Sequence, residues 1–252
     1  MSIRLGPRDW WGMQWLSQMG GAPIDVLADL LAQWPLRPSR SAKPNSEENA
    51  YRVAQRWRAA GKLVEERHRP VPGPEWVVPN ADTASPLLGF PVPEWVPSPM
   101  MAAHTTAAAR LRLHLAKGQR SDTWVSERVL RHRNGFRTRP GEPMPHLHDG
   151  LWTDDLGHLC AIEVELTRKG SSEARATMQA AYDAAEEIGA QQLIYYCGSD
   201  EVRSRVRAAA ADLTTTPSGP QVISRPAAHI FDPSASAVDP GADVVAAGGA
   251  AS

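Results

Sequence analysis

The sequence contains little cysteine and no long apolar run. Of its 252 residues only two are cysteine, Cys160 and Cys197, and both fall in short apolar runs typical of buried strands. Two cysteines exclude a disulfide framework, and no Cys/His spacing matches a zinc site, so free thiols in a reducing cytosol fit best. Because no segment resembles a signal peptide or could span a bilayer, we expect a soluble, cytoplasmic protein with no membrane partner.

Charge of one sign is also lacking overall, since the formal net charge is -1. Positive charge nevertheless gathers between residues 110 and 139, where nine Lys or Arg stand against two acids, a surplus of seven. A stretch of this kind attracts polyanions such as nucleic acids. The alternative is a solvated surface whose charge is balanced by acids from elsewhere in the fold.

The first eighty residues predict three helices and a hairpin. Apolar residues recur at helical spacing over residues 8–19, 23–33 and 46–60, and two short strands flank a Pro-Gly turn within residues 62–80. This order is typical of a winged helix-turn-helix, a fold that places one helix in the major groove of DNA. We therefore predict a DNA-binding domain over residues 1–80.

The third predicted helix is the one expected to enter the DNA groove. Its apolar face, which includes Val53 and Trp57, is needed for packing, so its basic side chains are left outside. Arginine recognises guanine and asparagine recognises adenine in the major groove, while the hairpin would reach phosphates. The residues predicted to contact DNA are Asn49, Arg52, Arg56, Arg58, Lys62, Arg67 and Arg69. A winged helix used for protein contact or dimerisation is the alternative.

The remaining chain divides into a linker, a second domain and a tail. Residues 81–103 are rich in Pro, Ala and Ser and are interpreted as a linker, and residues 232–252 lack the apolar content for a core and are expected to be disordered. Residues 104–231 predict a mixed domain of helices and strands. Its expected elements are helices at 104–117, 172–188 and 200–213, strands at 122–126, 192–197 and 221–224, and a strand pair within 145–170.

The strand pair carries the candidate chemistry. Asp149 is expected near the end of the first strand, and Glu163 and Glu165 share one face of the second because strand side chains alternate. A turn at Leu156-Gly157 would bring Asp149 beside the two glutamates. Clustered carboxylates repel unless a cation neutralises them, and oxygen ligands suit Mg²⁺ or Mn²⁺. The alternative is a strand face that is simply solvated.

This arrangement resembles the PD-(D/E)xK superfamily of restriction-endonuclease-like nucleases. Asp149 matches the first acid of its motif and Glu163 the second, whereas Glu165 stands where the superfamily usually has lysine and His148 replaces the proline. The resemblance implies a metal held by Asp149 and Glu163, with Glu127 as a further ligand. It also implies that Glu165 or Lys169 orients the attacking water, which makes Asp149, Glu163, Glu165 and Lys169 the predicted catalytic residues.

Three segments are more specifically similar to the replication-relaxation family of actinobacterial plasmids, integrative elements and phages. They are WVSERVLR at 124–131, HDG at 148–150 and AIEVELTRKG at 161–170. The resemblance implies a winged helix fused to a nuclease-like domain that acts in replication or maintenance of mobile-element DNA. The expected partners are DNA, a second copy of the chain and other proteins of the element.

Two functional hypotheses remain open on the sequence alone. The leading one is a DNA-binding protein with a metal-dependent nuclease domain, active or catalytically silent. The other is a transcriptional or copy-number regulator whose C-terminal domain only dimerises or binds a partner. The histidines near the acids, which are His146, His148 and His158, are interpreted as loop residues and not as ligands of a transition metal. Gln179 and Tyr182 are expected to face the candidate site.

Overall fold

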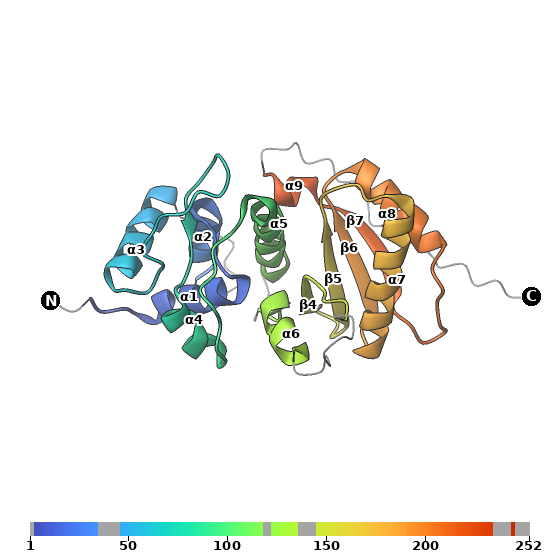
Figure 1. Ribbon diagram of the computed structural model, residues 1–252, viewed down its shortest axis with the longest axis horizontal. Helices are drawn as coiled ribbons and strands as arrows, with labels where there is room; N and C mark the ends of the chain where they lie inside the picture. The colour runs from blue at the N-terminus through green and yellow to red at the C-terminus, as the bar shows by residue number, and fades with distance from the viewer. Residues whose placement is uncertain (1–2, 35–45, 118–121, 136–144, 234–242, 245–252) are drawn as a thin grey trace, which may run out of the picture. The chain divides into compact units, whose positions relative to one another are not determined.

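The computed structural model describes residues 3–34, 46–117, 122–135, 145–233 and 243–244. The chain forms two compact units, Met1–Asp122 and Thr123–Ser252, and both combine helices with strands (Figure 1). Within the described ranges no helix has the length and apolar character that crossing a membrane would require.

The first unit contains the helices and the hairpin that the sequence predicts. Its elements are α1 (Pro7–Met19), β1 (Ala22–Pro23), α2 (Ile24–Ala32), α3 (Glu47–Ala59), β2 (Trp76–Val77), α4 (Ala81–Leu88) and α5 (Pro99–Ala116). The two hairpin arms meet through the antiparallel bridges Leu63↔Pro79 and His68↔Trp76, and β2 also pairs antiparallel with β1. The small sheet therefore includes a segment between the first two helices, which sequence periodicity did not predict.

The core of the first unit gathers the apolar faces of α1, α2 and α3. Trp57 is fully buried there, and α1 passes so close to its ring that a Cβ on Gly12 would lie 2.9 Å from it. Ala109 and Leu113 of α5 pack into the same core. The sequence had assigned this helix to the second domain from residue 104, because its apolar face does not reveal which core it joins.

The segment 81–103, predicted as a linker, is helical at both ends, since α5 already includes its last five residues, 99–103. Its first eight residues form α4, because the Asn80 side chain accepts a hydrogen bond from Thr83 N at 3.0 Å and so caps the helix start. Gly89 ends the helix in the left-handed region at φ +78°, a conformation that glycine adopts without strain. Local capping here outweighs the Pro-rich composition.

The second unit is built on a mixed sheet. Among the described residues its strands lie in the order β3-β4-β5-β6-β7-β8, with antiparallel pairing from β3 to β5, parallel pairing from β5 to β7 and antiparallel pairing of β7 with β8. The elements are β3 (Val125–Ser126), α6 (Glu127–Asn134), β4 (Gly150–Thr153), β5 (Leu159–Glu165), α7 (Ser171–Glu187), β6 (Gln192–Cys197), α8 (Asp200–Ala211), β7 (Gln221–Pro226), α9 (Ala228–Phe231) and β8 (Asp243–Val244).

Two details at the end of the chain differ from the prediction. The strand predicted at 221–224 continues to Pro226, and its residues Ile223 and Ser224 pair with β8. Residues 243–244 belong to the tail that was expected to be disordered, yet they form that short strand. The rest of the tail beyond residue 233 lies outside the described residues.

Helices α7 and α8 run alongside β5, β6 and β7, as Figure 1 shows for the orange part of the chain. Their apolar residues pack on one face of the sheet, against Ala161, Leu193, Tyr195 and Cys197. Because side chains two residues apart in a strand point to the same face, Glu163 and Glu165 share the face of Ala161. The carboxylates therefore lie on the helix-covered face, at the end of β5.

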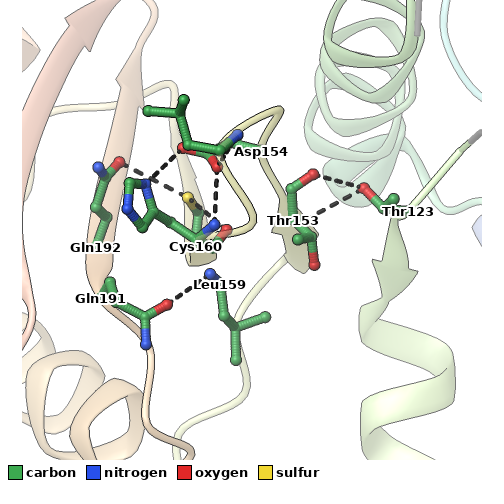
Figure 2. Close-up of polar contacts among 9 residues, drawn as sticks. Thr123, Thr153, Asp154, Leu159, Cys160, Gln191 and Gln192 are labelled. Atoms are coloured by element: carbon green, nitrogen blue, oxygen red, sulfur yellow. Dashed lines mark hydrogen bonds and ion pairs between the residues drawn. The ribbon is translucent and has the colours of Figure 1, made fainter. Parts of the chain in front are cut away.

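The β4–β5 hairpin is held at its turn, which we call the far end of the hairpin, by side-chain hydrogen bonds (Figure 2). Asp154 accepts hydrogen bonds from Leu156 N at 2.9 Å and His158 N at 2.8 Å, while Gln191 accepts one from Leu159 N at 2.7 Å. Gly157 turns the chain at φ +85°. The turn predicted at residues 156–157 is confirmed, and it determines which residues of the two strands face each other.

Asp9 is the buried acid on which the first core depends. Its carboxylate accepts hydrogen bonds from Gly6 N and Trp57 Nε1, both at 2.8 Å, and pairs with Arg56. We expect Asp9→Ala to lower the free energy of unfolding by about 1–3 kcal/mol, because it leaves the buried donors Gly6 N and Trp57 Nε1 without an acceptor. Denaturant unfolding measures this loss. In the exposed pair of Glu48 with Arg52, Glu48→Ala should change stability by less than about 0.5 kcal/mol. Equal losses would contradict the role of Asp9.

Candidate functional site

Asp149 meets the end of β5 at the open end of the β4–β5 hairpin. The prediction that it lies near the end of the first strand is wrong, because β4 begins at Gly150 and Asp149 immediately precedes it. Since the strands are antiparallel, the start of β4 faces the end of β5, and Asp149 N donates to Ile162 O at 3.1 Å. The Asp149 carboxylate accepts a hydrogen bond from Val164 N at 2.6 Å. The proximity to Glu163 therefore holds, although for a different topological reason.

Glu163 is bound by two histidines. Its Oε1 atom lies 2.8 Å from His146 Nε2 and 2.7 Å from His148 Nδ1. His148 is buried, and its Nε2 atom has no hydrogen-bond partner among the described residues. Burial alone would raise the pKa of Glu163, but the hydrogen bonds and charges of the two imidazoles outweigh it and hold the pKa below its usual value.

His146 and His148 lie in a loop as the sequence predicted, but their contact with Glu163 was not foreseen. Their signal was the i,i+2 spacing in an extended segment, which places both rings on the same side of the chain directly before Asp149. The carboxylate also acts on them: burial lowers the pKa of His146, but the hydrogen bond and charge of Glu163 and the charge of Asp149 raise it above its usual value. His158 does not join them, because its Nδ1 atom lies 3.0 Å from Asp154 at the far end of the hairpin.

Lys169 brings an ammonium group to the same place. Its Nζ atom lies 2.5 Å from Glu165 Oε2, so this lysine pairs with the glutamate four residues before it. The ammonium is also close enough to His146 for its charge to oppose the rise in the pKa of that histidine. With neutral histidines, three carboxylates and one ammonium leave a net charge of -2 at the site.

Tyr195 lies on β6 beside the cluster formed by His146, His148 and Glu163. It is the parallel-strand partner of Glu163, its side chain is buried, and its hydroxyl has no hydrogen-bond partner in the described part of the chain. Burial, followed by the charges of Glu163, Glu165 and Asp149, raises the pKa of Tyr195 well above its usual value. Beside it, a small hollow, partly open to solvent, is lined by Glu165, Lys169, Tyr195 and Arg205 among others.

Other residues expected at the site lie elsewhere. Glu127 begins α6 and pairs with Arg131 of the same helix, and it belongs to no cluster of metal-binding side chains within the described ranges. Gln179 donates to Thr214 O at 3.0 Å. Tyr182 accepts a hydrogen bond from Thr216 N at 3.1 Å, so both α7 residues hold the loop before β7 and do not face the carboxylates.

The residues predicted to bind DNA differ in their exposure. Arg58 and Lys62 are partly buried, since Arg58 lies 3.0 Å from Glu75 and Lys62 lies 5.6 Å from the centre of the Trp10 ring. The Asn49 backbone takes part in the cap formed by Ser46. The residues that are exposed and accessible to a ligand are Arg52, Arg56, Arg67 and Arg69, although the first three also pair with Glu48, Asp9 and Glu75, respectively.

The basic segment 110–139 is not one positive surface. Arg112 is buried and pairs with Asp122 at 2.6 Å, and Arg110 pairs with Asp25. Burial lowers the pKa of Arg128. Residues 118–121 and 136–139 of the segment lie outside the described residues. Where the structure describes the segment, Asp25 pairs with one of its arginines, while Asp122 and Glu127, already counted in the surplus, pair with two others.

The arrangement on the second unit is a mixed sheet with acids and histidines converging at the open end of one hairpin. Comparison of the chain with protein-family models, with curated proteins and with solved structures found no match. The relation to nucleases therefore depends on the residues and topology described above.

The histidine–glutamate pairing predicts a distinct pH dependence of stability without metal. The raised pKa of His146 contributes stability below its usual value of 6.5, which is lost as pH rises through the folded-state pKa. The lowered pKa of Glu163 contributes stability above 4.5, which is lost as pH falls. In EDTA, the melting temperature of wild type should exceed that of Glu163→Gln most between pH 4.5 and 6.5. A pH-independent difference, like that expected for the exposed Glu173→Gln control, would contradict the pairing.

Proposed function

We propose that this chain is a DNA-binding protein of a mobile genetic element whose second unit is a metal-dependent endonuclease domain of the PD-(D/E)xK type. Its role would be in replication or maintenance of plasmid, integrative-element or phage DNA, as the resemblance to the replication-relaxation family suggests. The observation that carries the proposal is the convergence of Asp149, Glu163, Glu165 and Lys169 at the junction of β4 and β5.

The topology supports this assignment. Nucleases of this superfamily need an acid beside a second strand that carries acid-x-lysine, and β4 and β5 supply the antiparallel hairpin for such a pair. The parallel β6 follows through α7, whereas the helix expected to lead this domain, α5, packs in the core of the first unit. Topology alone does not define function, so the assignment depends on the residues at the hairpin.

The donor set suits a divalent cation. Asp149 and Glu163 would hold it, because both offer carboxylate oxygens at the same end of the hairpin, and the net charge of -2 matches its charge. When bound, Mg²⁺ or Mn²⁺ would polarise the scissile phosphate and lower the pKa of a bound water. The paired Glu165 and Lys169 would orient the attacking water and the phosphate through a carboxylate acceptor and an ammonium donor.

The helix order of the first unit supports DNA binding. A strand between α1 and α2, followed by α3 and a hairpin, is the arrangement in which a winged helix presents its third helix to DNA. Arg52 on α3 and Arg67 and Arg69 on the hairpin supply the exposed cations. The apolar side of α3 is committed to the core, so its contact with a ligand must use this outer side.

A regulator without catalytic activity is the second candidate, and one observation favours it. Asp149 and Glu163 already accept hydrogen bonds from the protein, from Val164 N and the two histidines. Polar groups satisfied in this way can persist as a structural cluster. In that case the second unit would serve dimerisation or partner binding.

Cleavage of supercoiled DNA with Mg²⁺ or Mn²⁺ separates the two candidates. We expect Asp149→Asn to reduce cleavage at least about 100-fold, because an amide can still accept the Val164 hydrogen bond but offers no charge to a cation. Binding of DNA should be unchanged. The matched control is Asp154→Asn at the far end of the same hairpin, which should cleave normally. Wild-type protein that cleaves with neither cation would favour the regulator.

Binding of DNA should depend on the exposed arginines. Arg52→Ala, Arg67→Ala and Arg69→Ala should each weaken binding at low salt. Removal of one arginine–phosphate interaction should make the slope of log K against log[salt] shallower by about 0.9, because one fewer counterion is released. Arg56 and Arg58 are poor choices because their replacement would also remove hydrogen bonds to the buried acids Asp9 and Glu75. Fluorescence anisotropy at several salt concentrations measures the slope.

Arg175 on α7 provides the control for this experiment, since it pairs with Asp212 in the second unit. Arg175→Ala should leave both affinity and salt slope unchanged. If the three arginine variants also behave like wild type, DNA binding does not use this face of the first unit.

A further inference from the structure

We infer that His146, His148 and Glu163 form a site for a first-row transition-metal dication, such as Mn²⁺, Co²⁺ or Zn²⁺, and that this site prefers such an ion to Mg²⁺. Binding of the metal does not depend on the proposed function. A role of that metal in DNA cleavage does rest on it. The carboxylates alone suit either Mg²⁺ or Mn²⁺, whereas the histidines restrict the expected ion to a transition metal.

The geometry brings three potential ligand atoms together. One ring nitrogen of His146, one of His148 and one Glu163 carboxylate oxygen all lie within 4.8 Å of one another. The hydrogen-bond distances of 2.8 and 2.7 Å are shorter than the spacing of about 3.4 Å between ligand atoms that tetrahedral Zn–N and Zn–O bonds of ~2.0–2.2 Å require. A small outward rotation of the side chains would therefore admit an ion between them.

The chemistry of the donors selects the class of metal. Two imidazoles and one carboxylate suit borderline ions of the first transition row, whereas Mg²⁺ takes oxygen ligands and retains its waters. Such a three-residue set also leaves coordination positions open for water or a phosphate oxygen. Asp149 lies close enough to influence His146 electrostatically and adds negative charge beside the ion.

One further observation indicates a ligand at this place. The Tyr195 hydroxyl is buried beside the cluster and has no hydrogen-bond partner among the described residues, which is costly unless a bound species completes its contacts. A cluster that existed only for stability would be expected to satisfy this group.

Metal binding by the untagged full chain tests the inference. After EDTA treatment and dialysis, addition of Co²⁺ should produce visible absorption bands that saturate at one equivalent, and Zn²⁺ should abolish them. Calorimetry should show that Zn²⁺ and Mn²⁺ each bind at least about 10-fold more tightly than Mg²⁺. Equal affinities, or absence of the Co²⁺ bands, would overturn the inference.

Side-chain variants assign the site. His146→Gln and Glu163→Gln should each weaken Co²⁺ binding at least about 10-fold, which matches the loss of one ligand. His148→Ala is less suited because that ring is buried and its removal can unfold the unit. The matched control His158→Gln removes a histidine at the far end of the hairpin and should bind like wild type.

The outcomes remain separable from the nuclease proposal. Binding that persists in the His146→Gln, Glu163→Gln double variant would overturn the assignment of the ligands. Tight Co²⁺ binding at one equivalent without cleavage of DNA by any of the metal-loaded forms would support the site and contradict the nuclease. Circular dichroism of each variant confirms that it remains folded.

Discussion

The contact of Glu163 with His146 and His148 is the interaction on which the rest of the candidate site depends. Glu163 projects from the helix-covered face of the sheet, where an isolated carboxylate would be costly. The two imidazoles keep it ionised and draw the segment before β4 against the end of β5. That segment carries Asp149, so the same contact sets the position of the second acid.

This arrangement explains why the site can serve a metal and also exist without one. With imidazoles on Glu163, a peptide donor on Asp149 and an ammonium on Glu165, every carboxylate has a protein partner. A cation would compete with these contacts, and because it must displace them its binding is coupled to small rotations of the same side chains. The preference between metals then follows from the imidazoles, which the carboxylate pattern alone does not reveal.

The sequence predicted much of the second unit because strand alternation is a local property. The IEVEL pattern correctly placed Glu163 and Glu165 on one face, and Leu156-Gly157 correctly placed the turn. It failed for Asp149, whose place at the start of β4 depends on hairpin register and not on composition. The sequence also did not predict that His146 and His148 contact Glu163, because an extended segment has no periodicity that shows which carboxylate its side chains will contact.

In the first unit the helices were predictable and the roles of their arginines were not. Val53 and Trp57 correctly indicate the packed face of α3. Whether an arginine on the other face is available depends on acids that the fold brings near, such as Asp9 for Arg56 and Glu75 for Arg58. The assignment of α5 likewise depends on tertiary contacts, because Ala109 and Leu113 would fit an apolar core of either unit.

Anomalous diffraction from crystals of the protein soaked in Mn²⁺ is the most direct test of a metal centre at this hairpin. We predict one strong peak within about 2.0–2.3 Å of the Glu163 carboxylate, with the His146 and His148 rings turned toward it. A structure in which both imidazoles keep their hydrogen bonds to Glu163 and no peak lies beside them would contradict such a centre.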